Sequence, residues 1–101
     1  LPQAEPMIAR LAVHLQKLGI EYDHSGLAGG GADVGQMRRL GMPAIDLNQD
    51  ASRYFDLHHT ANDTLDKVDP QELRQNLAAW VTLTYLTASS TVAVGPVEPS
   101  E

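Results

Sequence analysis

The strongest constraint on the fold is a long helix that the sequence predicts to begin at Asp69. Asp69 suits the N-cap, Pro70 the first helical position, and Glu72 the third position of a capping-box-like arrangement. Apolar residues then recur on one face at helical spacing, namely Leu73, Leu77, Trp80, Val81 and Thr84, with Leu83, Tyr85 and Leu86 widening it. This stripe predicts a helix that buries a broad face against a sheet, with Trp80 in the core.

The remaining elements are shorter. Pro6 and a helical apolar repeat predict a first helix that stops at Gly19. Alternation over 20–24 and an apolar stretch over 42–47 predict two strands, separated by a short helix that Asp33 caps and Gly41 ends. Residues 48–68 show no regular spacing of apolar residues, so they are expected to form a loop. The length of this loop and its aromatic and histidine residues indicate a functional role.

Helices that alternate with strands predict an α/β fold with parallel strands. Two strands do not make a stable open sheet, so the amphipathic helices are expected to pack on strands from elsewhere or from a second copy. We therefore predict a fragment of a larger domain over 1–90 and a flexible tail over 91–101, and the absence of an initiating Met agrees with a processed or excised piece.

Charge and composition exclude several classes of binding partner. The 101 residues carry a net charge of −6, which argues against nucleic acid and against an anionic membrane surface. No apolar run reaches the length of a membrane span. The absence of cysteine excludes disulfides and thiolate metal sites.

Two adjacent histidines, His58 and His59, lie in an acidic stretch that either binds a cation or is a solvated loop. In an extended backbone their rings would point to opposite sides, so one of them would serve packing or hydrogen bonding. A catalytic zinc ion needs three protein ligands, and Asp56 and Asp63 show no recognisable ligand spacing. The histidines alone therefore predict an incomplete metal site.

The glycine-rich segment 29–31 is neither a dinucleotide fingerprint nor a phosphate-binding loop. It is either a flexible turn or a loop whose backbone approaches a substrate, with Asp33 at its end. Tyr54 and Phe55 are expected to pack rather than to contact substrate, and Asp63 could simply cap the local turn at Thr64.

These motifs together resemble the C-terminal part of the co-catalytic di-zinc exopeptidases, first the carboxypeptidase Q-like members and then the bacterial leucyl-type aminopeptidases. The resemblance covers roughly residues 8 to 88, and its segments occur in family order at 29–34, 40–44, 54–64 and 68–70. Its most specific piece is His59-Thr60-Ala61-Asn62-Asp63-Thr64, followed by a helix that starts at Val68-Asp69-Pro70.

The resemblance implies a fragment of a three-layer α/β/α zinc-peptidase fold with a mixed, largely parallel sheet. It implies that His59 is a zinc ligand, whereas the family's other ligands and its general-base Glu lie upstream and are not matched here, so this chain would contribute no catalytic residue. In such enzymes two Zn²⁺ ions polarise the scissile carbonyl and activate a bridging water. Gly30, Gly31 and Asp33 would border the substrate pocket, with Ala32 in place of the family's usual Ser, and Asp63 could orient the imidazole of His59.

The leading hypothesis is thus a portion of a zinc metallopeptidase that removes terminal residues from a peptide or dipeptide and is inactive without the remainder of the parent chain. The family resemblance implies an exported protein. Whether the enzyme is an aminopeptidase or a carboxypeptidase stays open. The alternatives are an interaction module that forms a homodimer to complete its sheet and, less favoured, a substrate-binding protein without catalysis.

Overall fold

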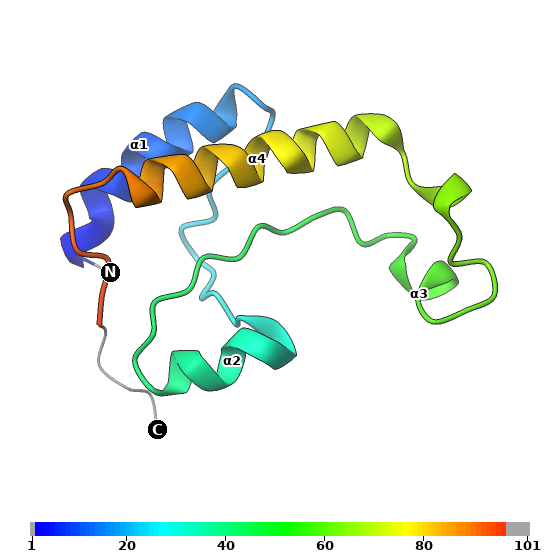
Figure 1. The fold of residues 1–101 in the computed structure, drawn as a ribbon, viewed down its shortest axis with the longest axis horizontal. Coiled ribbons are helices and arrows are strands. Elements are labelled where there is room, and N and C mark those ends of the chain that lie inside the picture. Colours follow the sequence, from blue (N-terminus) through cyan, green and yellow to red (C-terminus); the bar gives the residue numbers. More distant parts are fainter. Residues whose placement is uncertain (1, 97–101) are drawn as a thin grey trace.

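The chain folds into helices joined by long irregular segments (Figure 1). The structure is a computed structural model that describes residues 2–96. Its helices are η1 (Pro2–Ala4), α1 (Glu5–Gln16), α2 (Gly31–Arg39), α3 (Tyr54–Leu57), η2 (Leu65–Lys67) and α4 (Pro70–Ala88). Both α3 and η2 lie within 48–68, the segment for which the sequence predicts a loop.

The predicted ends of the two long helices are confirmed. The Asp69 carboxylate accepts hydrogen bonds from the backbone N–H groups of Gln71 at 2.7 Å and Glu72 at 3.3 Å, as expected of an N-cap. After α1, Gly19 adopts a left-handed φ of 75°, and Ile20 N–H donates to the Leu15 carbonyl at 3.1 Å. Such a reversal satisfies a terminal carbonyl and ends the helix.

The core lies where α1 crosses α4. Figure 1 shows the two helices side by side, and among the described α-helices they are the pair in close contact. Its buried residues are Leu11 and Leu15 from α1 and Ala79 and Leu83 from α4. The Ala79 side chain is 1% exposed, and its small size lets the two backbones approach closely.

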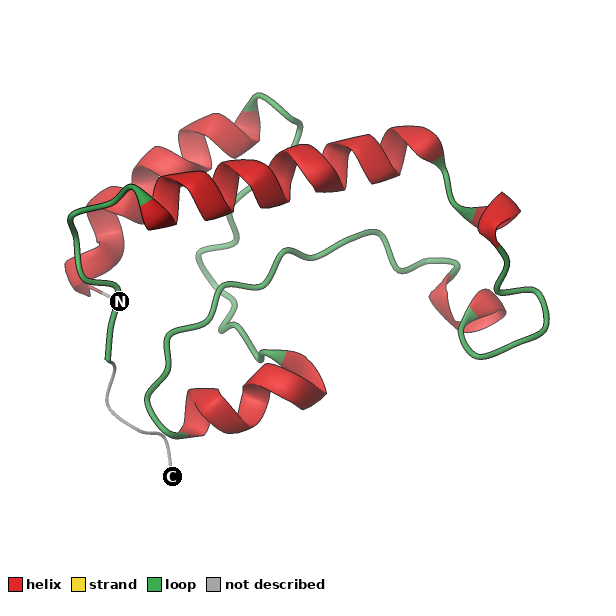
Figure 2. Cartoon of the chain, in the orientation of Figure 1, coloured by secondary structure: helices red, strands yellow, loops and turns green. Residues whose placement is uncertain are grey.

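The predicted sheet is wrong. Residues 2–96 contain no strand (Figure 2), which overturns the three-layer α/β/α assignment. A strand exists through backbone hydrogen bonds to a neighbour, but the candidates at 20–24 and 42–47 do not pair. Their first residues instead bond to the C-terminal turns of the preceding helices. Ile20 N–H donates to the Leu15 carbonyl and Met42 N–H to the Met37 carbonyl, each at 3.1 Å. Neither segment therefore has a paired neighbouring backbone within residues 2–96.

Without a sheet the molecule is open. Its radius of gyration is 15.5 Å, whereas a compact domain of this length measures about 13 Å. The helices α2 and α3 make no close contact with another described helix. Instead, the loop that leads into α2 bonds to Asp46, and α3 shares a pocket with Asp69 and Glu72 at the start of α4.

The prediction that α4 buries the face around Leu77 and Trp80 is wrong, although Leu83 and Leu86, which widen the predicted stripe, do belong to the α1–α4 core. Ala79 and Leu83 contact α1, whereas the stripe that includes Leu77 and Trp80 is exposed. Trp80, expected in the core, is 52% exposed. The stripe is apolar, as predicted, but the described chain supplies no surface that covers it.

Two further observations complete the fold. No helix in the described part is both long enough and apolar enough to cross a membrane. Within the predicted tail, 91–96 form neither helix nor strand, and 97–101 lie outside the described residues.

Candidate functional site: the histidine turn

The two adjacent histidines form the centre of a type II β-turn. His58 has φ −53° and ψ 123°, His59 has φ 57°, and Thr60 N–H donates to the Leu57 carbonyl at 3.0 Å. These are the angles and the hydrogen bond of that turn type. We call residues 57–60 the histidine turn.

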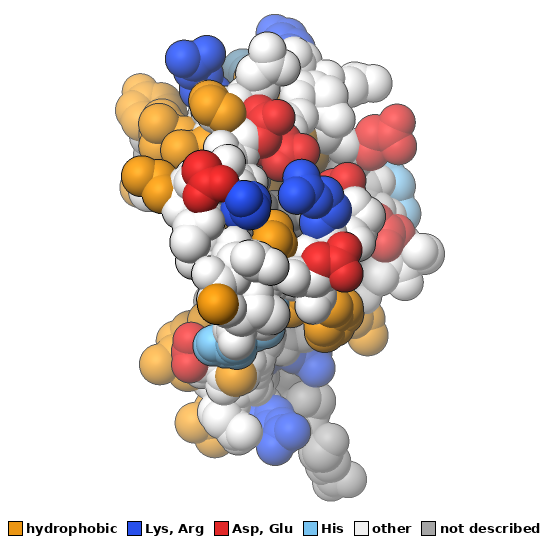
Figure 3. Space-filling view, turned by 90° about the vertical axis from the view of Figure 1, so that its right-hand side faces the viewer, with side chains coloured by type: hydrophobic (Ala, Val, Ile, Leu, Met, Phe, Trp, Pro, Cys, Tyr) orange, Lys and Arg blue, Asp and Glu red, His pale blue; other side chains and the backbone are white. Residues whose placement is uncertain are grey.

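The turn places both imidazoles together, contrary to the expectation that they point to opposite sides. Their ring centroids are 3.8 Å apart, with a 53° angle between the planes. The expectation assumed an extended backbone, and the turn at His59 removes that alternation. Both side chains are exposed, and Figure 3 shows histidine side chains at the surface of the face that carries α3.

The backbone of His59 is in a conformation that glycine favours. Among the described non-glycine residues, His59 is the one with a positive φ. A left-handed conformation costs an L-residue roughly 1–2 kcal/mol because Cβ approaches the following carbonyl oxygen. Backbone strain of this kind is concentrated at functional sites, so its coincidence with the predicted metal ligand supports a role for the His59 imidazole.

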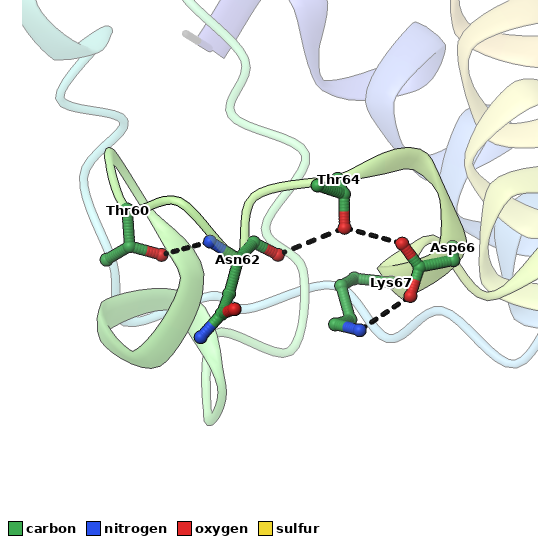
Figure 4. A network of polar contacts seen from close by, with 5 residues as sticks. All are labelled: Thr60, Asn62, Thr64, Asp66 and Lys67. Carbon is green, nitrogen blue, oxygen red and sulfur yellow. Dashed lines mark hydrogen bonds and ion pairs between the residues drawn. The ribbon is translucent and has the colours of Figure 1, made fainter.

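Hydrogen bonds fix the chain as it leaves the turn (Figure 4). The Thr60 hydroxyl donates to the Leu57 carbonyl at 2.7 Å and accepts from Asn62 N–H at 3.2 Å. Further along, the Asp66 carboxylate accepts from the Lys67 ammonium and the Thr64 hydroxyl, each at 2.5 Å. The same two contacts, Lys67 first, lower the pKa of Asp66.

A pocket of about 310 Å³ adjoins the turn. Its lining is polar and charged, and comprises Asp50, Ser52, Arg53, Tyr54, Leu57, His58, Asp63, Lys67, Asp69 and Glu72. His58 contributes to this wall, and His59 does not. Among the described residues, neither imidazole donates a hydrogen bond to the Asp63 carboxylate, so its orienting role stays a prediction.

The glycine-rich loop forms a separate site. The backbone N–H groups of Gly29 and Gly30 donate to one oxygen of Asp46, at 2.7 and 3.2 Å. Gly30 and Gly31 have φ values of 75° and 58°, and a Cβ on Gly30 would lie 3.0 Å from Gly35 N. Both the conformation and the close backbone of Gly35 therefore favour glycine at 30, and Asp46 is the residue that sequence reasoning missed.

The expected cap of α2 by Asp33 is wrong. The N-cap is Gly30, which has no side chain to accept a hydrogen bond, and Asp33 lies inside the first turn. There its negative charge is favourable near the helix N-terminus. Figure 1 shows α2 and α3 well apart, so the described chain does not bring Gly30, Gly31 or Asp33 to the histidine turn.

The donor set does not fit a zinc site by itself. Within 2–96, no three His, Cys, Asp or Glu residues are placed to hold one metal ion. The histidine turn offers two neighbouring imidazoles, one fewer protein ligand than catalytic zinc requires. The assignment of His59 as a zinc ligand therefore stays a prediction that needs donors from outside the described residues.

Comparison with known proteins relates this chain to peptidases. The similar proteins reported below are all named carboxypeptidase Q. The chain is 29% identical over 89 residues to carboxypeptidase Q of Xenopus laevis, covering 86% of this chain and 18% of that protein. It is 33% identical over 61 residues to the Bos taurus protein, covering 60% and 13%, and 32% identical over 60 residues to the Homo sapiens protein, covering 59% and 13%.

The chain thus spans less than one fifth of the length of these curated relatives. No family model matches it, and no solved structure matches it. The carboxypeptidase Q part of the resemblance is confirmed as a peptidase-like relationship. Zinc dependence and the link to bacterial aminopeptidases stay predictions.

Proposed function

We propose that this chain is part of a zinc-dependent exopeptidase and contributes one metal ligand, His59. The observation that carries the proposal is the exposed imidazole of His59 on a left-handed backbone. A glycine would fit this turn position at lower conformational cost. A task for the imidazole would account for histidine at this position, and metal ligation is the task that the similarity to carboxypeptidase Q favours.

The two imidazoles have different roles in this proposal: His59 binds the metal ion, and His58 does not. His58 Nε2 lies 3.0 Å from the Tyr54 hydroxyl, and the His58 ring lines the polar pocket. The His59 ring makes no hydrogen bond to a described residue, and His59 is exposed. This asymmetry supports His59 rather than His58 as the ligand.

The full site in this proposal holds two zinc ions and acts on a terminal bond of a peptide or dipeptide in an exported enzyme. The remaining ligands and the general base come from outside the described residues. The resemblance alone supports a place for Gly30, Gly31 and Asp33 at the border of the substrate pocket. Because the ligands present do not complete a site, we expect this chain alone to hydrolyse no peptide.

A zinc titration followed by NMR of the four histidine side chains tests the proposal. We expect weak binding that shifts the His59 imidazole signals more than those of His14 and His24. His59→Ala should abolish the response, whereas His14→Ala, an exposed histidine on α1, should leave it intact. Tight, stoichiometric binding at two sites, or a response that survives His59→Ala, would contradict the assignment.

One observation favours a second candidate, a non-catalytic module that associates with a second copy. The exposed stripe on α4 includes Leu73, Leu77 and Trp80, whose spacing of four and three residues is that of a helix-pairing seam. Such a module would form a homodimer through α4 rather than through a sheet.

Sedimentation equilibrium separates the two candidates. The module requires a dimer that Trp80→Ser converts to a monomer without loss of helical content. The peptidase proposal expects no such α4-dependent dimer. A monomer at concentrations up to about 100 μM, where even a weak dimer would be populated, would count against the module.

A further inference from the structure

Three aromatic rings lie in sequence across α3 and the histidine turn. The Tyr54 ring stacks on the His58 ring, with centroids 4.3 Å apart and an interplanar angle of 22°. The His58 ring in turn contacts the His59 ring at 3.8 Å. Tyr54 is therefore connected to the proposed ligand through one intervening imidazole.

The local backbone explains why these rings meet. Tyr54 and His58 are four residues apart, the spacing at which side chains on a helix face each other. His58 N–H donates to the Tyr54 carbonyl at 2.8 Å, so the helical hydrogen bond reaches the first residue of the pair of histidines. The chain then reverses at His59, which folds the second imidazole back against the first.

The side chains add a directional contact to the stack. The Tyr54 hydroxyl lies 3.0 Å from His58 Nε2. A neutral imidazole has one donor nitrogen and one acceptor nitrogen. If the hydroxyl donates to Nε2, the proton of neutral His58 must reside on Nδ1.

We propose that Tyr54 is a positioning residue for the histidine turn. Its hydroxyl donates to His58 Nε2 and fixes the Nδ1–H tautomer, while its ring holds the His58 ring in place. The fixed His58 ring occupies one side of His59 and limits its rotation, so that the His59 imidazole is presented to the exterior. The inference rests on the proposed function, because it explains how this chain orders the ligand of that site.

The test uses two variants and is carried out without metal. Imidazole ¹⁵N and ¹H signals are measured at about pH 8, where histidine side chains are ordinarily neutral. In the wild type, His58 should show mainly the Nδ1–H tautomer. Tyr54→Phe should remove this preference yet keep the ring-current shift of the His59 protons, and Tyr54→Ala should lose both.

Phe55→Ala is the matched control. Phe55 is the neighbouring aromatic residue, is 87% exposed, and meets Tyr54 edge-on at 5.2 Å. Its removal should leave the His58 tautomer and the His59 shifts unchanged. Backbone amide signals of 60–67 serve as a second measurement, since unchanged signals there show that the turn is still folded.

Two results would overturn the proposal. One is a wild-type His58 that is mainly Nε2–H, and the other is a Tyr54→Ala variant with wild-type His59 shifts and an intact turn. Either result leaves the zinc titration of the wild type untouched. Conversely, a wild type that fails to bind zinc through His59 can still show the tautomer and the ring stack, so the two proposals fail separately.

Discussion

Replacing Leu83 with alanine is expected to lower the free energy of unfolding by about 2–3 kcal/mol. Leu83 is 8% exposed and belongs to the small cluster that joins α4 to α1. Truncating a buried leucine loses the transfer free energy of the removed carbons and leaves a cavity. Because the described part of the chain has few buried residues, this loss is a large fraction of its stability.

Leu77→Ala provides the matched control, because the same substitution is made on the same helix at a residue that is 62% exposed. We expect it to change the free energy of unfolding by less than about 1 kcal/mol. Urea denaturation followed by far-UV circular dichroism measures both. Equal losses for the two variants would show that the exposed stripe is covered in solution and that the α1–α4 contact is not the dominant core.

Two substitutions of His59 are expected to separate its backbone cost from its chemical role. Both His59→Gly and His59→Ala remove the imidazole and should abolish the histidine response to zinc. His59→Gly should nevertheless be about 1 kcal/mol more stable than His59→Ala, because only alanine keeps a Cβ in the left-handed conformation. The exposed position means that little packing is lost in either variant.

Thermal unfolding of the two variants and the wild type, at equal concentration and without metal, provides the measurement. His59→Gly should also be at least as stable as the wild type. A glycine variant less stable than the alanine variant would show that φ of residue 59 is not left-handed in solution. That outcome would remove the observation on which the functional assignment of His59 rests.

The sequence motif predicted which residues belong to the candidate site. Residues 59–64 and the helix start at 69 indicated the peptidase relationship that the comparisons confirm. Their three-dimensional arrangement was not predictable in the same way. A histidine at a turn position that favours glycine gives no turn signal, so the contact between the two imidazoles was missed. The four-residue spacing of Tyr54 and His58 was the signal that could have revealed their contact.

The sequence by itself determined the features that depend on near neighbours. Asp69 caps the amides two and three residues further on, and Gly19 ends a helix through its own φ. The tertiary structure alone decided which apolar face of α4 is covered and whether 20–24 and 42–47 pair. Those outcomes depend on surfaces distant in sequence. The spacing of apolar residues along the chain shows which of them share one face of a helix or strand. Burial of that face requires a partner surface, and a strand requires a neighbouring backbone.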